Sequence, residues 1–168
     1  MGHRWQSQKT NLYLRRRGRP SGVRPAGGVV VDASCIPARR SSEVDGYFHG
    51  RVEWQGRDLA TGEKLFSSLV YPQSTINIGE SCAIIEALKR LHENGDTKTV
   101  VYSDSEIAIN WVANGYHRSK LPMNEFTWEA LDKMDELFAW LVEAAPMNTV
   151  RKWETRHWGE NPADYGRK

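Results

Sequence analysis

Four carboxylates stand at positions of this chain where they could hold divalent cations together. Asp32 follows the apolar run Val29–Val31, Glu80 lies at the start of an expected helix, Asp104 follows a second apolar run, and Asp164 lies near the C-terminus. Hard cations such as magnesium need several oxygen ligands, which proteins usually supply as Asp and Glu from separate elements. The pattern therefore favours metal-dependent cleavage of a nucleic-acid backbone.

Asp32 and Glu80 both interrupt apolar patterns. A carboxylate on a buried strand is costly unless it is paired or metal-bound, although Asp32 could instead cap a turn with Ser34. On a helix expected to start at Gly79, Glu80 shares a face with the apolar side chains that pack on the sheet. Alternatively, Glu80 could be an acid in the first turn of the helix, stabilised by the helix dipole. That role does not explain why Glu80 lies on the apolar face of the helix.

Asp104 could be an N-cap, although a functional role is favoured for it, and Asp164 has a weak signal by itself. Ser103 and Glu106 have the spacing of a capping box, which leaves Asp104 at the first helical position, free to point from the end of a strand. Asp164 lies two residues after the pair Asn161-Pro162, a usual turn starter, and an acid is routine at the start of a helix. Only the other three carboxylates make a functional role the better interpretation.

Two further residues near the C-terminus could act on a nucleic acid. His157 could carry a proton close to Asp164, but a solvated loop histidine is the commoner case. Trp158 could stack on a base or sugar, or it could pack on the core. No glycine-rich phosphate loop and no Ser-His-Asp order competes with the metal hypothesis.

Length and composition indicate one domain with a real core. The chain has 168 residues, of which 39% are hydrophobic. No apolar run reaches the roughly 20 residues of a membrane span, and no secretory signal is evident. Cys35 and Cys82 form neither a disulfide framework nor a zinc spacing, so we expect reduced thiols, a cytosolic location and no membrane partner. We also expect a monomer.

Charge is unevenly distributed although the net charge is only +2. Seven of the 23 basic residues precede Asp32, and none of the 21 acidic residues does. We therefore expect residues 1–28 to be a flexible basic arm that grips a polyanionic partner, and residues 29–168 to be the catalytic domain. The alternatives are a merely solubilising tail and, with less support, an organelle transit sequence.

Periodicity predicts hairpins first and helical crossovers afterwards. This order favours an α/β fold with a mixed sheet covered by helices. The expected strands are 29–34, 47–54, 64–71, 98–103 and 148–155, and the expected helices are 80–93, 106–112, 125–143 and a short turn near 164.

Four motifs in this order resemble type 1 ribonuclease H. They are Val31-Asp32-Ala33-Ser34, Thr75-Ile76-Asn77-Ile78-Gly79-Glu80, Tyr102-Ser103-Asp104-Ser105 and Gly159-Glu160-Asn161-Pro162-Ala163-Asp164. The resemblance implies the ribonuclease H-like fold, a five-stranded mixed sheet of order 3-2-1-4-5 with helices on both faces. It also implies that Asp32, Glu80, Asp104 and Asp164 bind two magnesium or manganese ions.

The resemblance also implies a substrate and its contacts. The reaction would be endonucleolytic hydrolysis of the RNA strand of an RNA–DNA hybrid, leaving a 5′-phosphate and a 3′-hydroxyl. Asn77, Ser34, Ser105 and Trp158 would contact the substrate, and His157 would belong to a flexible catalytic loop. The alternatives are a DNA nuclease or resolvase of the same superfamily, and a non-catalytic hybrid-binding module.

Departures from the family pattern concern substrate contacts. Ile76 replaces an expected asparagine, and Ala33 replaces the usual glycine after the first carboxylate. The basic helical protrusion of well-studied bacterial members is absent, with only His117, Arg118 and Lys120 before the next helix. We expect the basic arm to compensate for these losses.

Overall fold

The computed structural model describes residues 22–40 and 48–166, and only the backbone at 37–40, 48 and 49. Its elements, in chain order, are β1 (Val29–Arg40), β2 (Phe48–Asp58), β3 (Lys64–Ser67), β4 (Tyr71–Ser74), α2 (Ile76–Glu93), β5 (Val101–Ser103), α3 (Glu106–Asn114), α4 (Trp128–Ala144), β6 (Val150–Lys152) and α5 (Thr155–Trp158). None of the helices in these ranges has the length and apolar character needed to span a bilayer.

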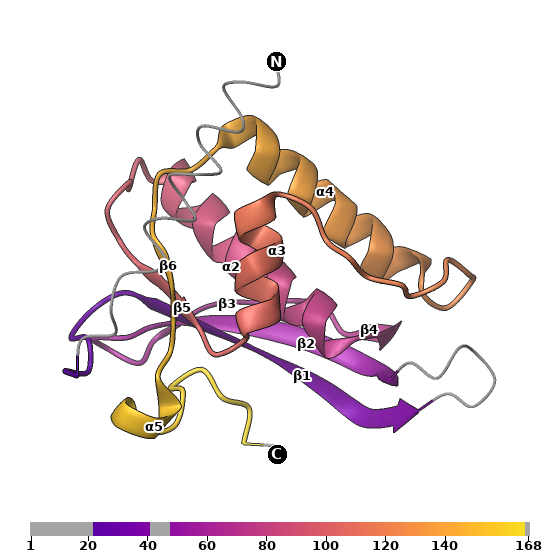
Figure 1. Cartoon of the computed structure of the whole chain (residues 1–168), viewed down its shortest axis with the longest axis horizontal. Coiled ribbons are helices and arrows are strands. Elements are labelled where there is room, and N and C mark those ends of the chain that lie inside the picture. The colour runs from indigo at the N-terminus through magenta and orange to yellow at the C-terminus, as the bar shows by residue number, and fades with distance from the viewer. Residues whose placement is uncertain (1–21, 41–47, 167–168) are drawn as a thin grey trace.

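The strands form one mixed sheet in the order β3-β2-β1-β5-β6. β1, β2 and β3 pair antiparallel, whereas β5 and β6 join in parallel after helical crossovers. The predicted α/β class and the order 3-2-1-4-5 are therefore confirmed, with β5 and β6 as the fourth and fifth strands of that prediction. α2, α3 and α4 cover one face of the sheet and α5 lies on the other (Figure 1).

Alternation along β1 divides the core between the two faces. Val29, Val31 and Ala33 join the large cluster under α2–α4, while Val30 joins a small cluster with Tyr102, Trp153 and Ala163 on the α5 face. Because side chains alternate along a strand, Asp32 belongs to the same face as Val30. The first carboxylate thus lies on the thinly covered side of the sheet.

Helix α2 crosses the large core and carries Glu80. Thr75 Oγ1 accepts from Ile78 N at 3.3 Å and caps the helix, and Asn94 ends it as predicted. Its buried side chains include Ile84, Leu88 and Cys82, all with zero exposure. Complete burial raises the pKa of the Cys82 thiol, whereas Cys35 on β1 is half-buried.

One predicted strand is in fact two. The expected strand 64–71 divides into β3 and β4, which both pair with β2. Between them Ser68 Oγ accepts from Trp54 N at 2.9 Å and donates to the carbonyl of Leu69 at 2.7 Å. Ser68 N also donates to Trp54 O at 2.8 Å, and the next two residues, Leu69 and Val70, are exposed to solvent.

Most other predicted elements also have ends that differ from the observed ones. α4 begins at Trp128, not at residue 125, because Asn124 Oδ1 accepts from the amides of Phe126 and Thr127 and forms a turn. The last strand ends at Lys152, and the following residues form α5. The expected helical turn near Asp164 is a hydrogen-bonded turn, closed by Asp164 N donating to Asn161 O.

The predicted arm, residues 1–28, lies outside the described residues as far as residue 21. Its last residues contact the body of the protein. The Arg24 guanidinium lies 5.6 Å from the centre of the Trp153 ring, and Gly28 O accepts from Leu59 N. The described end of the segment therefore runs against the α5 face.

Candidate metal centre

Three of the predicted carboxylates converge. One oxygen from each of Asp32, Glu80 and Asp104 lies within 4.8 Å of the other two. They come from β1, from α2 and from the loop after β5, so the part of β1 just beyond its pairing with β5 and the carboxyl end of β5 meet the first turns of a helix there. Asp32 and Glu80 are buried, and Asp104 is half-buried.

Gly79 lets Glu80 approach the sheet. A Cβ atom on Gly79 would lie 2.6 Å from Val52 Cγ1 and 2.9 Å from the Ala33 Cβ atom, closer than packed atoms approach. The helix therefore packs with its backbone against β1 and β2, and Glu80 Oε1 accepts from Ala33 N at 3.4 Å. This close contact brings the Glu80 carboxylate beside Asp32.

Helix α2 starts earlier than predicted, which changes the interpretation of Glu80. The helix begins at Ile76, so Glu80 is its fifth residue and the first turn holds no acid. The helix dipole therefore does not account for this carboxylate. Glu86, six residues further along α2, is half-buried and accepts from Trp54 Nε1 at 3.0 Å.

Asp104 lies in the loop between β5 and α3. The predicted capping box was wrong, because Ser105 caps α3 through its Oγ, which accepts from Ala108 N at 3.2 Å. Ser103 is fully buried at the end of β5, and its Oγ accepts from Ser105 N at 3.1 Å. Asp104 therefore precedes the helix and projects from a loop that two serines hold.

The electrostatics of the cluster favour a cation. Burial, followed by the negative charges of Asp32 and Asp104, raises the pKa of Glu80 well above its usual range. Glu80 Oε2 is buried and has no hydrogen-bond partner. Buried carboxylate oxygens without donors are costly, and a hard divalent ion is the group whose chemistry suits such a donor set. The residues present therefore fit a magnesium or manganese ion.

Asp164 is not one of this group of three. It is half-buried and follows a segment that is hydrogen-bonded to β1 and β2. Asn161 Nδ2 donates to Val31 O at 2.9 Å, one residue before Asp32. The role of Asp164 as a fourth metal ligand stays a prediction.

The other predicted site residues come from α2, β1, the loop before α3, and α5. Asn77 is half-buried in the first turn of α2, three residues before Glu80, and Ser34 is buried two residues after Asp32. Ser105 uses its hydroxyl to cap α3, and His157 is exposed on α5. Their substrate contacts and the proton transfer stay predictions.

Trp158 takes the packing role among its two alternatives. It is half-buried, with its ring centre 5.2 Å from Trp153 and 6.2 Å from Tyr102. These edge-to-face contacts fix the short helix α5 on the sheet. Stacking of Trp158 on a nucleic acid stays a prediction.

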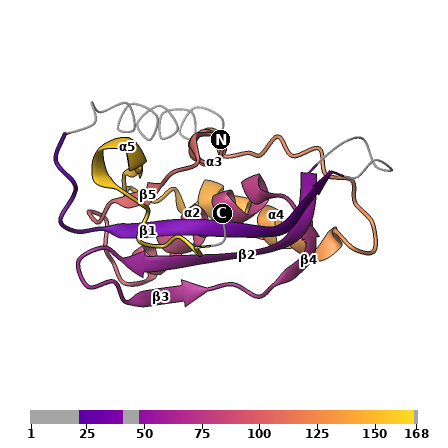
Figure 2. The same ribbon diagram turned by 90° about the horizontal axis from the view of Figure 1, so that it is seen from below.

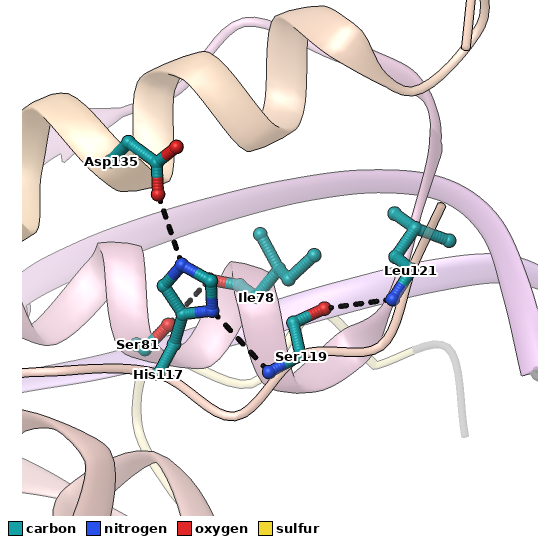
Figure 3. Close-up of polar contacts among 6 residues, drawn as sticks. All are labelled: Ile78, Ser81, His117, Ser119, Leu121 and Asp135. Carbon is teal, nitrogen blue, oxygen red and sulfur yellow. Dashed lines mark hydrogen bonds and ion pairs between the residues drawn. The ribbon is translucent and has the colours of Figure 1, made fainter. Parts of the chain in front are cut away.

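The short connection between α3 and α4 replaces the protrusion expected from the family. Ser119 N donates to His117 Nδ1 at 3.3 Å, which leaves the ring proton on Nε2, 2.9 Å from Asp135 Oδ1 (Figure 3). Leu121 N donates to Ser119 Oγ at 3.2 Å. These bonds fasten the connection to α4, so His117 has a structural role there.

Three residues that contact the segments carrying the carboxylates have no clear functional signal in the sequence. Gly79 was noted only as a helix start, although a glycine beside a predicted ligand indicates close backbone approach. Asn161 has the sequence signal of a turn starter, and Gln55 lies just after the expected strand 47–54. A buried amide opposite Asp32 in the strand register would have been the signal for Gln55.

No family model matches the chain. Several solved structures of low sequence identity are similar to it. LC11-RNase H1, isolated from compost by a metagenomic approach, is 19% identical with a TM-score of 0.48, over 76% of this chain and 84% of that one. The N-terminal RNase H domain of Rv2228c from Mycobacterium tuberculosis is 18% identical with a TM-score of 0.43, over 77% of this chain and 89% of that one.

A third match is RNase H1 from Halobacterium salinarum NRC-1, 13% identical with a TM-score of 0.42, over 77% of this chain and 86% of that one. All of these are ribonuclease H structures. The sheet order described above is the order that the sequence resemblance implied.

Proposed function

We propose that this protein is a metal-dependent endoribonuclease of the type 1 ribonuclease H family, which hydrolyses the RNA strand of RNA–DNA hybrids. The observation that carries the proposal is the convergence of Asp32, Glu80 and Asp104, with oxygens within 4.8 Å of one another. A cluster of like charges is unfavourable unless a cation occupies it, and binding a phosphate backbone alone needs no such cluster. The substrate class comes from the sequence motifs that resemble the family.

The carboxylates would hold two magnesium or manganese ions, with Asp164 as the fourth ligand. When bound, such ions polarise a phosphodiester and a water molecule and stabilise the leaving oxygen. Asp32 and Glu80 would supply ligands from rigid elements, and Asp104 from the loop after β5. This placement fixes the donor oxygens before substrate arrives, which lowers the reorganisation needed for reaction.

The remaining predicted residues would act around this centre. Asn77 and Ser34 lie beside Glu80 and Asp32 along their elements, where they could contact the hybrid, whose RNA strand is distinguished by 2′-hydroxyl groups. His157 is exposed and could exchange a proton with solvent. The monomeric state and the cytosolic location belong to the same proposal.

The decisive experiment compares three labelled substrates: an RNA–DNA hybrid, a DNA duplex and a branched DNA junction. Each is incubated with the full chain in magnesium, in manganese and in chelator. We expect cleavage of the RNA strand of the hybrid with either metal and none in chelator. Cutting of DNA instead would identify a DNA nuclease or resolvase, and binding without any cutting would identify a hybrid-binding module.

A further inference from the structure

The segment that carries Asp164 is held by side chains, not by secondary structure. It follows α5 on the face of the sheet opposite α2–α4 and crosses β1 (Figures 1 and 2). Asn161 is buried and uses both ends of its amide: Nδ2 donates to Val31 O at 2.9 Å, and Oδ1 accepts from Ala163 N at 2.8 Å. The turn is closed by Asp164 N donating to Asn161 O at 2.9 Å.

A second amide reaches the segment from the sheet. Gln55 on β2 is 3% exposed, and its Nε2 donates to the carbonyl of Ala163. Gln55 is the residue directly opposite Asp32 in the antiparallel register of β1 and β2. Directly opposed residues of an antiparallel pair point to the same face, so this amide lies beside the first carboxylate.

The carbonyl of Val31 is available to Asn161 because β5 is short. It pairs with β1 only at Val29 and Val30, and the next carbonyl along β1, that of Val31, is the one that Asn161 binds. The C-terminal segment thus takes the place beside β1 that a longer β5 would have filled. The hydrogen bonds lie one residue before Asp32 and one residue before Asp164.

We infer that Gln55 and Asn161 are positioning residues that fix Asp164 relative to Asp32; the inference rests on the proposed function. We call their bonds to Ala163 and Val31 the amide latch. Its anchors are backbone atoms adjacent to the two carboxylates, so a shift of the latch moves Asp164 with respect to the other three acids. Second-layer hydrogen bonds of this kind orient metal ligands, and losing one typically costs about 10- to 100-fold in metal affinity or activity.

The test combines an activity measurement with one that needs no activity. Gln55→Leu removes the donor while keeping the side-chain size, and Asn161→Ala removes both bonds of that amide. In the full chain we expect faster hydrogen exchange at the Ala163 and Asp164 amides, a roughly 10- to 100-fold lower kcat on the hybrid, and a KM within about twofold of wild type. Gln55→Leu keeps the test valid if Asn161→Ala does not fold.

A double-mutant cycle separates positioning of Asp164 from general damage. If Gln55 acts through Asp164, then Gln55→Leu should have no further effect on kcat in an Asp164→Asn background. Two matched controls are available. Gln73→Leu changes a half-buried glutamine on β4, and Asn148→Ala removes a buried amide that donates to Thr99 O at 3.0 Å. Both should leave kcat unchanged.

Different outcomes overturn different claims. Unchanged exchange at Ala163 and Asp164 in Gln55→Leu would refute the amide latch itself. An equal loss of kcat in the wild-type and Asp164→Asn backgrounds, or in either control, would refute positioning of Asp164. Absence of hybrid cleavage by the wild-type protein would instead overturn the proposed function, and with it the catalytic consequence of the latch.

Discussion

Two kinds of structure hold the four carboxylates. Asp32, Glu80 and Asp104 come from β1, α2 and the end of β5, elements whose apolar side chains fill the large cluster under α2–α4. Asp164 follows an irregular segment on the opposite face, where a small aromatic cluster and the amide latch hold it. Apolar packing of the core fixes the elements that carry Asp32, Glu80 and Asp104, whereas a few hydrogen bonds fix the segment that carries Asp164.

The largest expected effect is on the rate of cleavage, after substitution of one of the three carboxylates on the elements of the large core. Asp32→Asn keeps the size of the side chain but removes a ligand charge, so cleavage of the hybrid should fall by about three orders of magnitude, or about 4 kcal/mol of transition-state stabilisation. Initial rates in magnesium measure the loss. Circular dichroism should show an intact fold, and a rate near that of wild type would remove Asp32 from the site.

The second prediction concerns the core under α2. Leu88→Ala leaves a cavity at a residue with no exposure, and we expect a loss of about 2 to 5 kcal/mol in the free energy of unfolding. Val70→Ala, at a residue 52% exposed, is the matched control and should change it by less than about 0.5 kcal/mol. Urea denaturation measures both. Equal effects would contradict the assignment of the large core.

The third prediction concerns the approach of α2 to the sheet. Gly79→Ala places a methyl group against Val52 and Ala33, so we expect a loss of stability of about 1 to 3 kcal/mol from overpacking. Because the helix must move away, Glu80 moves with it and cleavage should fall as well. Gly95→Ala would not serve as a control, because Gly95 has a φ of 69° and alanine is strained in this left-handed conformation. Glu93→Gln, exposed on the same helix, serves better. Unchanged stability in Gly79→Ala would contradict the close packing.

The smallest expected effect is a gain in stability. The raised pKa of Glu80 means that the folded protein binds a proton more tightly than the unfolded chain does. Without metal, the free energy of unfolding should therefore fall as pH rises above the unfolded value of about 4.3. Glu80→Gln removes this penalty and should stabilise the metal-free protein by about 1 to 2 kcal/mol at neutral pH, with no gain below pH of about 4.

Thermal melts over a pH series, in chelator and in magnesium, measure this effect. Magnesium should stabilise the wild type and should stabilise Glu80→Gln less, because the ligand charge is gone. Glu93→Gln, on the exposed side of α2, should show neither change. If Glu80→Gln were less stable than wild type at neutral pH, repulsion between the carboxylates of the cluster would not destabilise the folded protein.

Much of this arrangement follows from local sequence patterns. The apolar run before Asp32, the helical spacing after Glu80 and the sheet order were predictable because periodicity and chain connectivity determine them. The capping of α3 was not, because Ser103 and Ser105 compete for the same role and burial of Ser103 decides between them. The amide latch joins residues 108 and 130 positions apart, so no local pattern indicates it.

The burial of Cys82 allows the opening of helix α2 to be measured with a thiol of the protein itself. This thiol lies two positions after Glu80 and has no exposure, whereas Cys35 is partly open to solvent. A thiol reagent should therefore modify Cys35 in the native protein and reach Cys82 only when the helix leaves the interior. The labelling rate of the second thiol would then give the opening free energy of the helix that carries Glu80, in the absence of denaturant and with no engineered probe.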